Sequence, residues 1–240
     1  MANSVIEIEG LRKRYGANEV LRGVDLSVDR GEFFGLVGVN GAGKTTLIKC
    51  LLDFVAVDAG SVRLFGVPAT DSHARAGLAY LPEKFTPPYY LSGRDFLDYM
   101  SALRGSEFRE AALGELLDVL DLEEAALSKP VRQLSKGMAQ KLGILSVLLG
   151  ESPLLVMDEP MSGLDPRVRA LLKPCLASLR TQGRTIFFST HLLHDVDALC
   201  DRLAILHRGR LAFIGSPTEC RRTFGTEDLE QAYLKCVAAA

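Results

Sequence analysis

The stretch that decides the fold is Gly38-Val39-Asn40-Gly41-Ala42-Gly43-Lys44-Thr45-Thr46. An apolar run at 33–37 precedes it, and apolar residues at helical spacing over 47–52 follow it. A strand, a glycine-rich loop and a helix in this order bind the phosphates of a nucleoside triphosphate. The glycines let successive backbone N–H groups point at phosphate oxygens, and the helix start adds the positive end of its dipole. We therefore expect all nine residues to form a nucleotide site.

Two side chains of this loop have separate roles in the prediction. Lys44 is expected to reach the β- and γ-phosphates as a point charge, and the hydroxyl of Thr45 is expected to ligate Mg²⁺. The alternative is a glycine-rich turn that happens to precede a helix. The flanking apolar strand and helical pattern argue against that alternative.

The composition is that of a soluble globular protein. Of 240 residues, 48% are hydrophobic and 24% are charged, and the net charge of −2 argues against a dedicated nucleic-acid binder. No apolar run approaches 18 residues, and the first residues lack the pattern of a signal peptide, so we expect no membrane span. The five cysteines are scattered without a Cys-x-x-Cys pair, which favours reduced thiols in a cytosolic compartment over a zinc site.

Apolar periodicity predicts two kinds of strand. Three runs near the start have antiparallel spacing, at 5–10, 23–28 and 61–65. Three later runs are short and mainly apolar, as in buried parallel strands, at 154–157, 185–189 and 203–206. Helical patterns at 164–180 and 192–200 separate them, although Pro174 is expected to kink or interrupt the first helix. The alternation predicts an α/β core with a parallel sheet.

Only helical patterns are found between about 83 and 150. A capping-box string at Ser92 and Asp95 precedes one, residues 107–120 form a second, and Ser135 is expected to cap a third that ends near 149. We therefore predict one domain over 1–240. Its parts are an α/β core with a β subdomain (1–82 and 151–225), an inserted helical subdomain (83–150) and a short C-terminal helix (226–240).

An apolar strand that ends in Asp158 and Glu159 places two carboxylates at the carboxyl edge of the sheet, beside the phosphate loop. Asp158 is expected to orient Mg²⁺ through its water shell. Glu159 is expected to align and deprotonate the water that attacks the γ-phosphate. The alternative is an acid pair that serves only a turn before Pro160.

Four segments follow the phosphate loop in a characteristic order. They are Leu-Ser-Lys-Gly-Met-Ala-Gln-Lys at 134–141, Leu-Leu-Val-Met-Asp-Glu-Pro at 154–160, Ser-Gly-Leu-Asp at 162–165 and Phe-Phe-Ser-Thr-His at 187–191. Over residues 5–224 the chain resembles the nucleotide-binding domain of ATP-binding cassette (ABC) proteins. The resemblance implies a P-loop NTPase (RecA-like) α/β core with an N-terminal antiparallel β subdomain and an inserted α-helical subdomain.

The resemblance also implies further site residues. His191 would contact the γ-phosphate and help to hold the water and the catalytic acid, and Tyr15 would stack on adenine. Ser135 and Gly137 open a helix that would point at the ATP of a second subunit, so two chains would dimerise head to tail, with Asp165 at their seam. Taken singly, these residues also fit a strand-end histidine, a surface tyrosine and an ordinary helix cap. The His-x-x-His spacing of His191 and His194 lacks a further ligand for a metal.

Two departures from the usual family pattern narrow the resemblance. Lys136 and Met138 replace a glycine and the glutamine of the usual Leu-Ser-Gly-Gly-Gln, and Glu83 stands where glutamine is usual. Glu83 can ligate Mg²⁺ through its carboxylate. Both variants resemble the branch that serves type-2 exporters. The implied cofactors are ATP and Mg²⁺. The implied partners are an integral-membrane permease and a second ATPase subunit, either a copy or a close homologue, with no nucleic acid. The implied location is cytoplasmic, on the inner face of the cell membrane.

The resemblance implies that a permease docks near residues 85–97. This segment leads from a loop into a helix and contains several apolar and aromatic side chains. We expect Tyr89 and Tyr90 to be exposed there, whereas Phe85, Phe96 and Leu97 fit the core of the helical subdomain equally well. Alternative functions are a non-transport ABC ATPase on a ribosome or nucleic-acid complex, a GTPase and a regulatory subunit without turnover. The chain lacks the Asn-Lys-x-Asp of GTPases, and Glu159 with His191 argues for turnover. The permease, rather than this chain, would select the transported substrate.

Overall fold

Two β-sheets and the helices around them make up the part of the chain that the computed structural model describes, residues 3–105 and 109–240. The smaller sheet is antiparallel, with the strand order β2-β1-β4-β5. Its strands are β1 (Ser4–Tyr15), β2 (Asn18–Asp29), β4 (Ala59–Leu64) and β5 (Val67–Pro68). The three predicted antiparallel strands are confirmed, and β1 and β2 are longer than their apolar runs because polar residues continue the hairpin to its turn.

The larger sheet has the order β10-β9-β3-β8-β7-β6, and only the β9–β10 pair is antiparallel. The three predicted parallel strands are confirmed as β7, β8 and β9. The central position of β3 places the loop that follows it between the ends of β8 and β9. The strands are β3 (Phe33–Val37), β6 (Leu78–Leu81), β7 (Leu154–Asp158), β8 (Thr185–Thr190), β9 (Arg202–His207) and β10 (Arg210–Gly215).

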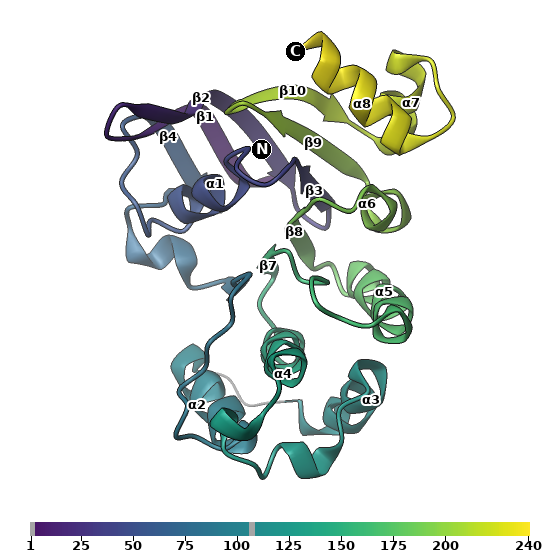
Figure 1. Ribbon diagram of the computed structural model, residues 1–240. Coiled ribbons are helices and arrows are strands. Elements are labelled where there is room, and N and C mark those ends of the chain that lie inside the picture. The colour runs from purple at the N-terminus through teal and green to yellow at the C-terminus, as the bar shows by residue number, and fades with distance from the viewer. Residues whose placement is uncertain (1–2, 106–108) are drawn as a thin grey trace.

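Both faces of the larger sheet are covered, so its central strands β3, β8 and β7 are buried along their whole length. Phe34 and Leu36 of β3 pack with the antiparallel sheet and α1 (Lys44–Leu51), whereas Phe33 and Val37 pack with the helices on the opposite face. This alternation follows the two-residue period of a strand. The helices on that second face include α5 (Pro166–Thr181) and α6 (Leu193–Leu199) (Figure 1). The sheet thus holds the loop after β3 rigidly from both sides.

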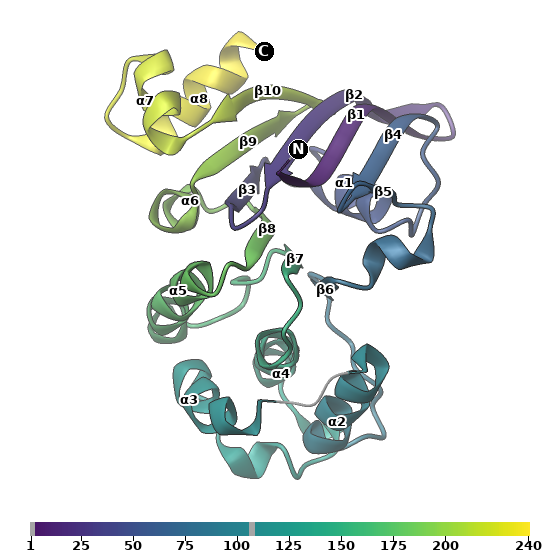
Figure 2. The same cartoon turned by 180° about the vertical axis from the view of Figure 1, so that it is seen from behind.

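The segment between β6 and β7 is helical and lies at one end of the molecule, away from the antiparallel sheet (Figures 1 and 2). The capping box of Ser92 and Asp95 is confirmed, as is Ser135 as a cap. The predicted start of the second helix at 107 lies outside the described residues. The helices are α2 (Gly93–Arg104), α3 (Glu110–Leu120) and α4 (Lys136–Leu149), with short 3-10 turns at Glu124–Ala126 and Val131–Gln133.

The helix α5 is not interrupted at Pro174, contrary to one of the two outcomes expected there. Pro174 is exposed, and so is Ala170, whose carbonyl loses its helical partner. Water can bond that carbonyl, while the buried stripe of α5 keeps the helix on the core. That stripe is Val168, Leu172, Leu176 and Leu179.

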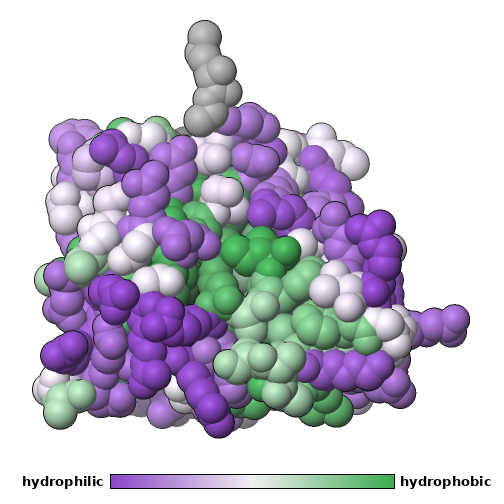
Figure 3. All heavy atoms as spheres, turned by 90° about the horizontal axis from the view of Figure 1, so that it is seen from above, coloured by the Kyte–Doolittle hydropathy of each residue, from purple (hydrophilic) through white to green (hydrophobic). Residues whose placement is uncertain are grey.

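The chain ends in α7 (Pro217–Phe224) and α8 (Leu229–Ala239), which pack beside β10; a 3-10 turn at Ser72–Arg75 precedes β6. Seen from above, this end of the molecule is mostly polar, with an apolar patch in the middle (Figure 3). Across residues 3–105 and 109–240, we find no helix whose length and apolar character would let it span a bilayer.

Candidate functional site

The loop between β3 and α1 has the conformation expected of a phosphate cradle. Gly41 and Gly43 have φ angles of 84° and 113°, in the region that favours glycine. A Cβ on Gly38 would lie 2.6 Å from the backbone oxygen of Leu206. Since Gly43 is the N-cap of α1, the free N–H groups of the first helical turn face the loop.

Replacing Gly43 by alanine is expected to destabilise the protein. A Cβ there would lie 3.0 Å from Leu21 Cδ2, and a non-glycine residue at positive φ costs about 1–3 kcal/mol. Gly114→Ala is the matched control, because Gly114 lies inside α3 with open space around it, and alanine there should stabilise by about 0.5–1 kcal/mol. Thermal unfolding without nucleotide should show melting shifts of opposite sign. A Gly43→Ala protein as stable as the unsubstituted one would contradict the strained loop.

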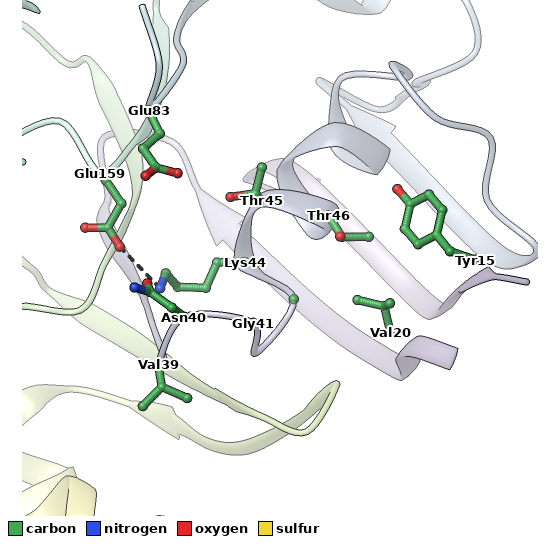
Figure 4. Close-up of a pocket in the computed structure, with 11 residues that line it drawn as sticks. Tyr15, Val20, Val39, Asn40, Gly41, Lys44, Thr45, Thr46, Glu83 and Glu159 are labelled. Atoms are coloured by element: carbon green, nitrogen blue, oxygen red, sulfur yellow. Dashed lines mark ion pairs between the residues drawn. The ribbon is translucent and has the colours of Figure 1, made fainter. Parts of the chain in front are cut away.

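A cavity of about 390 Å³ opens over this loop (Figure 4). Its two ends differ, with Tyr15 and Val20 at one end and Glu83 and Glu159 at the other. Sequence reasoning missed Val20, which lies on β2 close to Tyr15 because the β1–β2 hairpin pairs Tyr15 with Asn18. The lining residues are Tyr15, Val20, Val39, Asn40, Gly41, Gly43, Lys44, Thr45, Thr46, Glu83 and Glu159.

Lys44 and Glu159 form a buried ion pair at the loop. The Nζ of Lys44 donates to the Gly38 carbonyl at 2.6 Å and lies 3.2 Å from Glu159 Oε1. The two side chains are only 6% and 8% exposed, so each charge needs the other. A triphosphate in the cavity would offer Lys44 a stronger anionic partner, which would release this oxygen of Glu159.

The second carboxylate oxygen of Glu159 faces His191. Its Oε2 is 2.9 Å from His191 Nδ1, and His191 is about half exposed. The backbone of Glu159 has a φ of 50°, a strained value for a residue with a side chain, and its N–H donates to the carbonyl and hydroxyl oxygens of Ser189 on β8. The carboxylate is therefore fixed between a lysine and a histidine, at the end of the parallel strands.

Asp158 has one satisfied and one unsatisfied oxygen. Oδ1 accepts a hydrogen bond from the Ser189 hydroxyl, whereas Oδ2 is buried without a hydrogen-bond partner among the described residues. Burial, together with the negative charges of Asp158 and Glu83, raises the pKa of Tyr80 to about 12. The carboxylates of Asp158 and Glu83 and the hydroxyl of Thr45 are oxygen donors of the kind that Mg²⁺ prefers. The orphaned oxygen of Asp158 fits this ion or a water bound to it.

Four predicted residues from outside the loop are not among those that line this cavity: Asp158, His191, Ser135 and Gly137. Ser135 Oγ accepts from the Met138 N–H at 3.2 Å at the start of α4, and its side chain is exposed. Asp165 likewise caps α5, and the N–H of Val168 holds the pKa of its carboxyl below the ordinary value. Both helix starts thus face solvent on this chain. Gly38 and Ala42 belong to the loop backbone and do not line the cavity either.

Tyr15 is 46% exposed, and the Nζ of Lys13 lies 5.4 Å from the centroid of its ring. The ring is therefore accessible to a ligand at the end of the cavity opposite Glu159 (Figure 4). His191 and His194 contact different partners: His191 contacts Glu159, and the Nε2 of His194 lies 2.5 Å from Lys173 Nζ.

Comparison with known proteins agrees with the nucleotide site that the geometry indicates. A family model described as ABC transporter matches residues 21–162. An uncharacterized ABC transporter ATP-binding protein of Synechocystis sp. is 41% identical over 204 residues, 84% of this chain and 58% of its own length. Nod factor export ATP-binding protein I of Ralstonia nicotianae is 39% identical over 225 residues, 90% of this chain and 68% of its own.

A solved structure, described as the ATP binding subunit of an ABC transporter, superposes with a TM-score of 0.88 at 33% identity, covering 97% of this chain and 99% of that one. The fold, the loop at 38–46 and these relatives all indicate the same family. The chain belongs to the ATP-binding proteins of ABC transporters, the ATPase subunits of these systems.

Proposed function

We propose that this chain drives an exporter by binding and hydrolysing ATP as one half of a dimer attached to a separate membrane permease. The observation that supports it most is the Glu159 carboxylate, fixed between Lys44 and His191 at the edge of the cavity. Export is supported by the Nod factor export relative and by Glu83, Lys136 and Met138, the variants that resemble the exporter branch. Attachment to a permease places the chain at the inner face of the cell membrane.

The proposed site uses both ends of the cavity. Adenine stacks on Tyr15 beside Val20, and the phosphates follow the loop to Lys44. Thr45, Asp158 and Glu83 are the residues that would hold Mg²⁺, and the ion would neutralise phosphate charge there. Positioning and charge compensation provide most of the catalysis of phosphoryl transfer, so the fixed backbone N–H groups of the loop contribute without reorganisation.

Proton transfer is assigned to Glu159. When the phosphates bind Lys44, its ammonium exchanges the Glu159 carboxylate for phosphate oxygens. Oε1 of Glu159 then accepts the proton of the attacking water, while Oε2 stays on His191 Nδ1. His191 also contacts the γ-phosphate. The strained backbone of Glu159 fixes its direction before substrate arrives.

The second subunit completes the site in this proposal. The start of α4, where Ser135 is exposed and Gly137 is half-buried, offers N–H groups that take the γ-phosphate held by a partner chain. Asp165 lies at the seam between the two chains. The partner is a second copy or a close homologue. ATP therefore closes the pair, and hydrolysis removes the phosphate that bridges it.

A docking surface for the permease is proposed at the start of α2. Tyr89 and Tyr90 are 67% and 68% exposed, as expected, and their rings lie edge to face at 5.6 Å. Phe96 and Leu97 are buried and Phe85 packs against the same core, so these three fill the helical subdomain. Exposed aromatic pairs are typical of protein interfaces.

The docking surface is tested by the double substitution Tyr89→Ala/Tyr90→Ala. A tagged protein should capture a polytopic membrane protein from detergent-solubilised membranes of its source organism, and the double variant should recover at least about tenfold less, because aromatic anchors dominate interfaces. Leu234→Ala is the control, since Leu234 is equally exposed, at 62%, but lies on α8. ATP hydrolysis by the isolated variants should be unchanged. Capture of ribosomes or nucleic acid instead of a membrane protein would favour the non-transport alternative.

A further inference from the structure

A buried carboxylate outside the nucleotide cavity has an unusual set of partners. Asp195 of α6 is 1% exposed, and its Oδ1 lies 2.7 Å from Lys173 Nζ. Its Oδ2 accepts from Arg169 Nη2 at 3.1 Å. Both cations belong to α5, which lies beside α6 in both ribbon views (Figures 1 and 2). The Nδ1 of His194 is also near, 3.2 Å from Oδ1.

The ion pairs of Asp195 with Lys173 and Arg169 join α6 to α5. A charge that is almost fully buried is tolerated only with close partners, so the geometry of the cluster is tightly specified. The helix α6 has only seven residues, and its N-cap, Leu192, makes no side-chain hydrogen bond. Short helices are marginal on their own, so the position of α6 depends on its tertiary contacts. Besides Asp195, those contacts come from the buried Leu193, Val196 and Leu199.

The short connection from β8 to α6 contains His191. The N–H of Leu192 donates to the Thr190 hydroxyl at 3.0 Å, and the N–H of Asp195 donates to the Leu192 carbonyl at 3.1 Å. His191 therefore lies between a strand fixed in the sheet and a helix fixed by Asp195. Its Nδ1 lies 2.9 Å from Glu159 Oε2. A shift of α6 relative to α5 would move His191 away from Glu159.

We propose that Asp195, clamped by Lys173 and Arg169, is a positioning residue for ATP hydrolysis. It fixes α6 on α5 and so holds His191 against Glu159. The proposal rests on the catalytic roles proposed above for His191 and Glu159. It gives a function to a charge cluster that makes no contact with the nucleotide cavity.

Other charged groups near α6 have different partners. Asp197 pairs with Arg221 of α7 at 2.5 Å, on another side of the helix. The acidic residues that line a groove with Asp197 are Glu227, Asp228 and Glu230. Among the described residues, the ion pairs of Asp195 are with Lys173, Arg169 and His194. Arg221→Gln therefore offers a control that removes an ion pair of α6 and leaves the ion pairs of Asp195 with α5 unchanged.

The test is a double-mutant cycle between Asp195→Asn and His191→Ala, with steady-state ATP hydrolysis as the measurement. Asp195→Asn alone should lower kcat at least about tenfold, because misplacing a catalytic group by about 1 Å can cost about a hundredfold. Its KM for ATP should change by less than about twofold, since the loss is confined to the transition state. In the His191→Ala background, Asp195→Asn should cause no further loss, because it acts through a side chain that is already absent.

Three further variants complete the experiment. Asp195→Glu keeps the charge and should recover most of the lost kcat. Arg221→Gln should match the unsubstituted protein. Lys173→Met, which removes one cation whose side chain is 17% exposed, replaces Asp195→Asn if that protein does not fold, and the same cycle applies.

Each outcome bears on one of the two proposals. Equal losses in both backgrounds, an unchanged kcat for Asp195→Asn, or a raised KM with normal kcat would overturn the positioning role. Normal hydrolysis by His191→Ala itself would instead remove the catalytic role of His191, and with it the proposal for Asp195.

Discussion

Glu159→Gln is expected to bind ATP and to hydrolyse it at least about a hundredfold more slowly, as the loss of a general base requires. The amide has nearly the size of the carboxylate, so it can keep the strained backbone at 159 and the contact with His191. It cannot accept the proton of the attacking water. Loss of the negative charge also removes the competitor for Lys44, whose Nζ lies 3.2 Å from Glu159, so affinity for the triphosphate should not fall.

Steady-state hydrolysis and calorimetric titration with Mg-ATP separate these two effects. Glu151→Gln is the matched control, because it makes the same chemical change at an exposed residue just before β7. It should hydrolyse ATP at the unsubstituted rate. Normal turnover by Glu159→Gln would refute the assignment of the general base.

Lys44→Ala is expected to weaken ATP binding about a hundredfold, equivalent to about 2.8 kcal/mol, the range of a hydrogen bond to a charged group. Among the described residues that line the cavity, Lys44 is the only lysine, and the substitution removes it. It also leaves the buried Glu159 carboxylate without its lysine partner, which adds an anion that repels the triphosphate.

A titration of ATP against Lys44→Ala and Lys49→Ala makes the comparison within one helix. Lys49 is an exposed lysine in the last turn of α1 and is not among the residues that line the cavity. Its variant should bind ATP as tightly as the unsubstituted protein. Unchanged ATP affinity of Lys44→Ala would remove the phosphate-binding role of the loop.

The sequence was sufficient to predict the sheet and the loop because their signals are local. Buried parallel strands are short apolar runs, as at 154–157, and glycine at 41 and 43 is required by positive φ angles. The position of Asp158 and Glu159 beside the loop followed from the rule that parallel strands end at one edge of a sheet.

Long-range contacts were not predictable in the same way. Val20 lines the cavity only because a hairpin folds β2 against β1. The ion cluster of Asp195 joins two helices through residues 22 or more positions apart, and no spacing along the chain indicates it. The effect of Pro174 depended on which face of α5 is exposed, a property of tertiary packing.

The proposed mechanism requires that Glu159, at the end of β7, activates a water molecule beside a triphosphate bound in the loop at 38–46. A crystal structure of Glu159→Gln with Mg-ATP tests it most directly. We expect the β- and γ-phosphates on the loop N–H groups and Lys44 Nζ, with one water between residue 159 and the γ-phosphorus. A loop without phosphates, or a residue 159 turned away from the γ-phosphate, would contradict it.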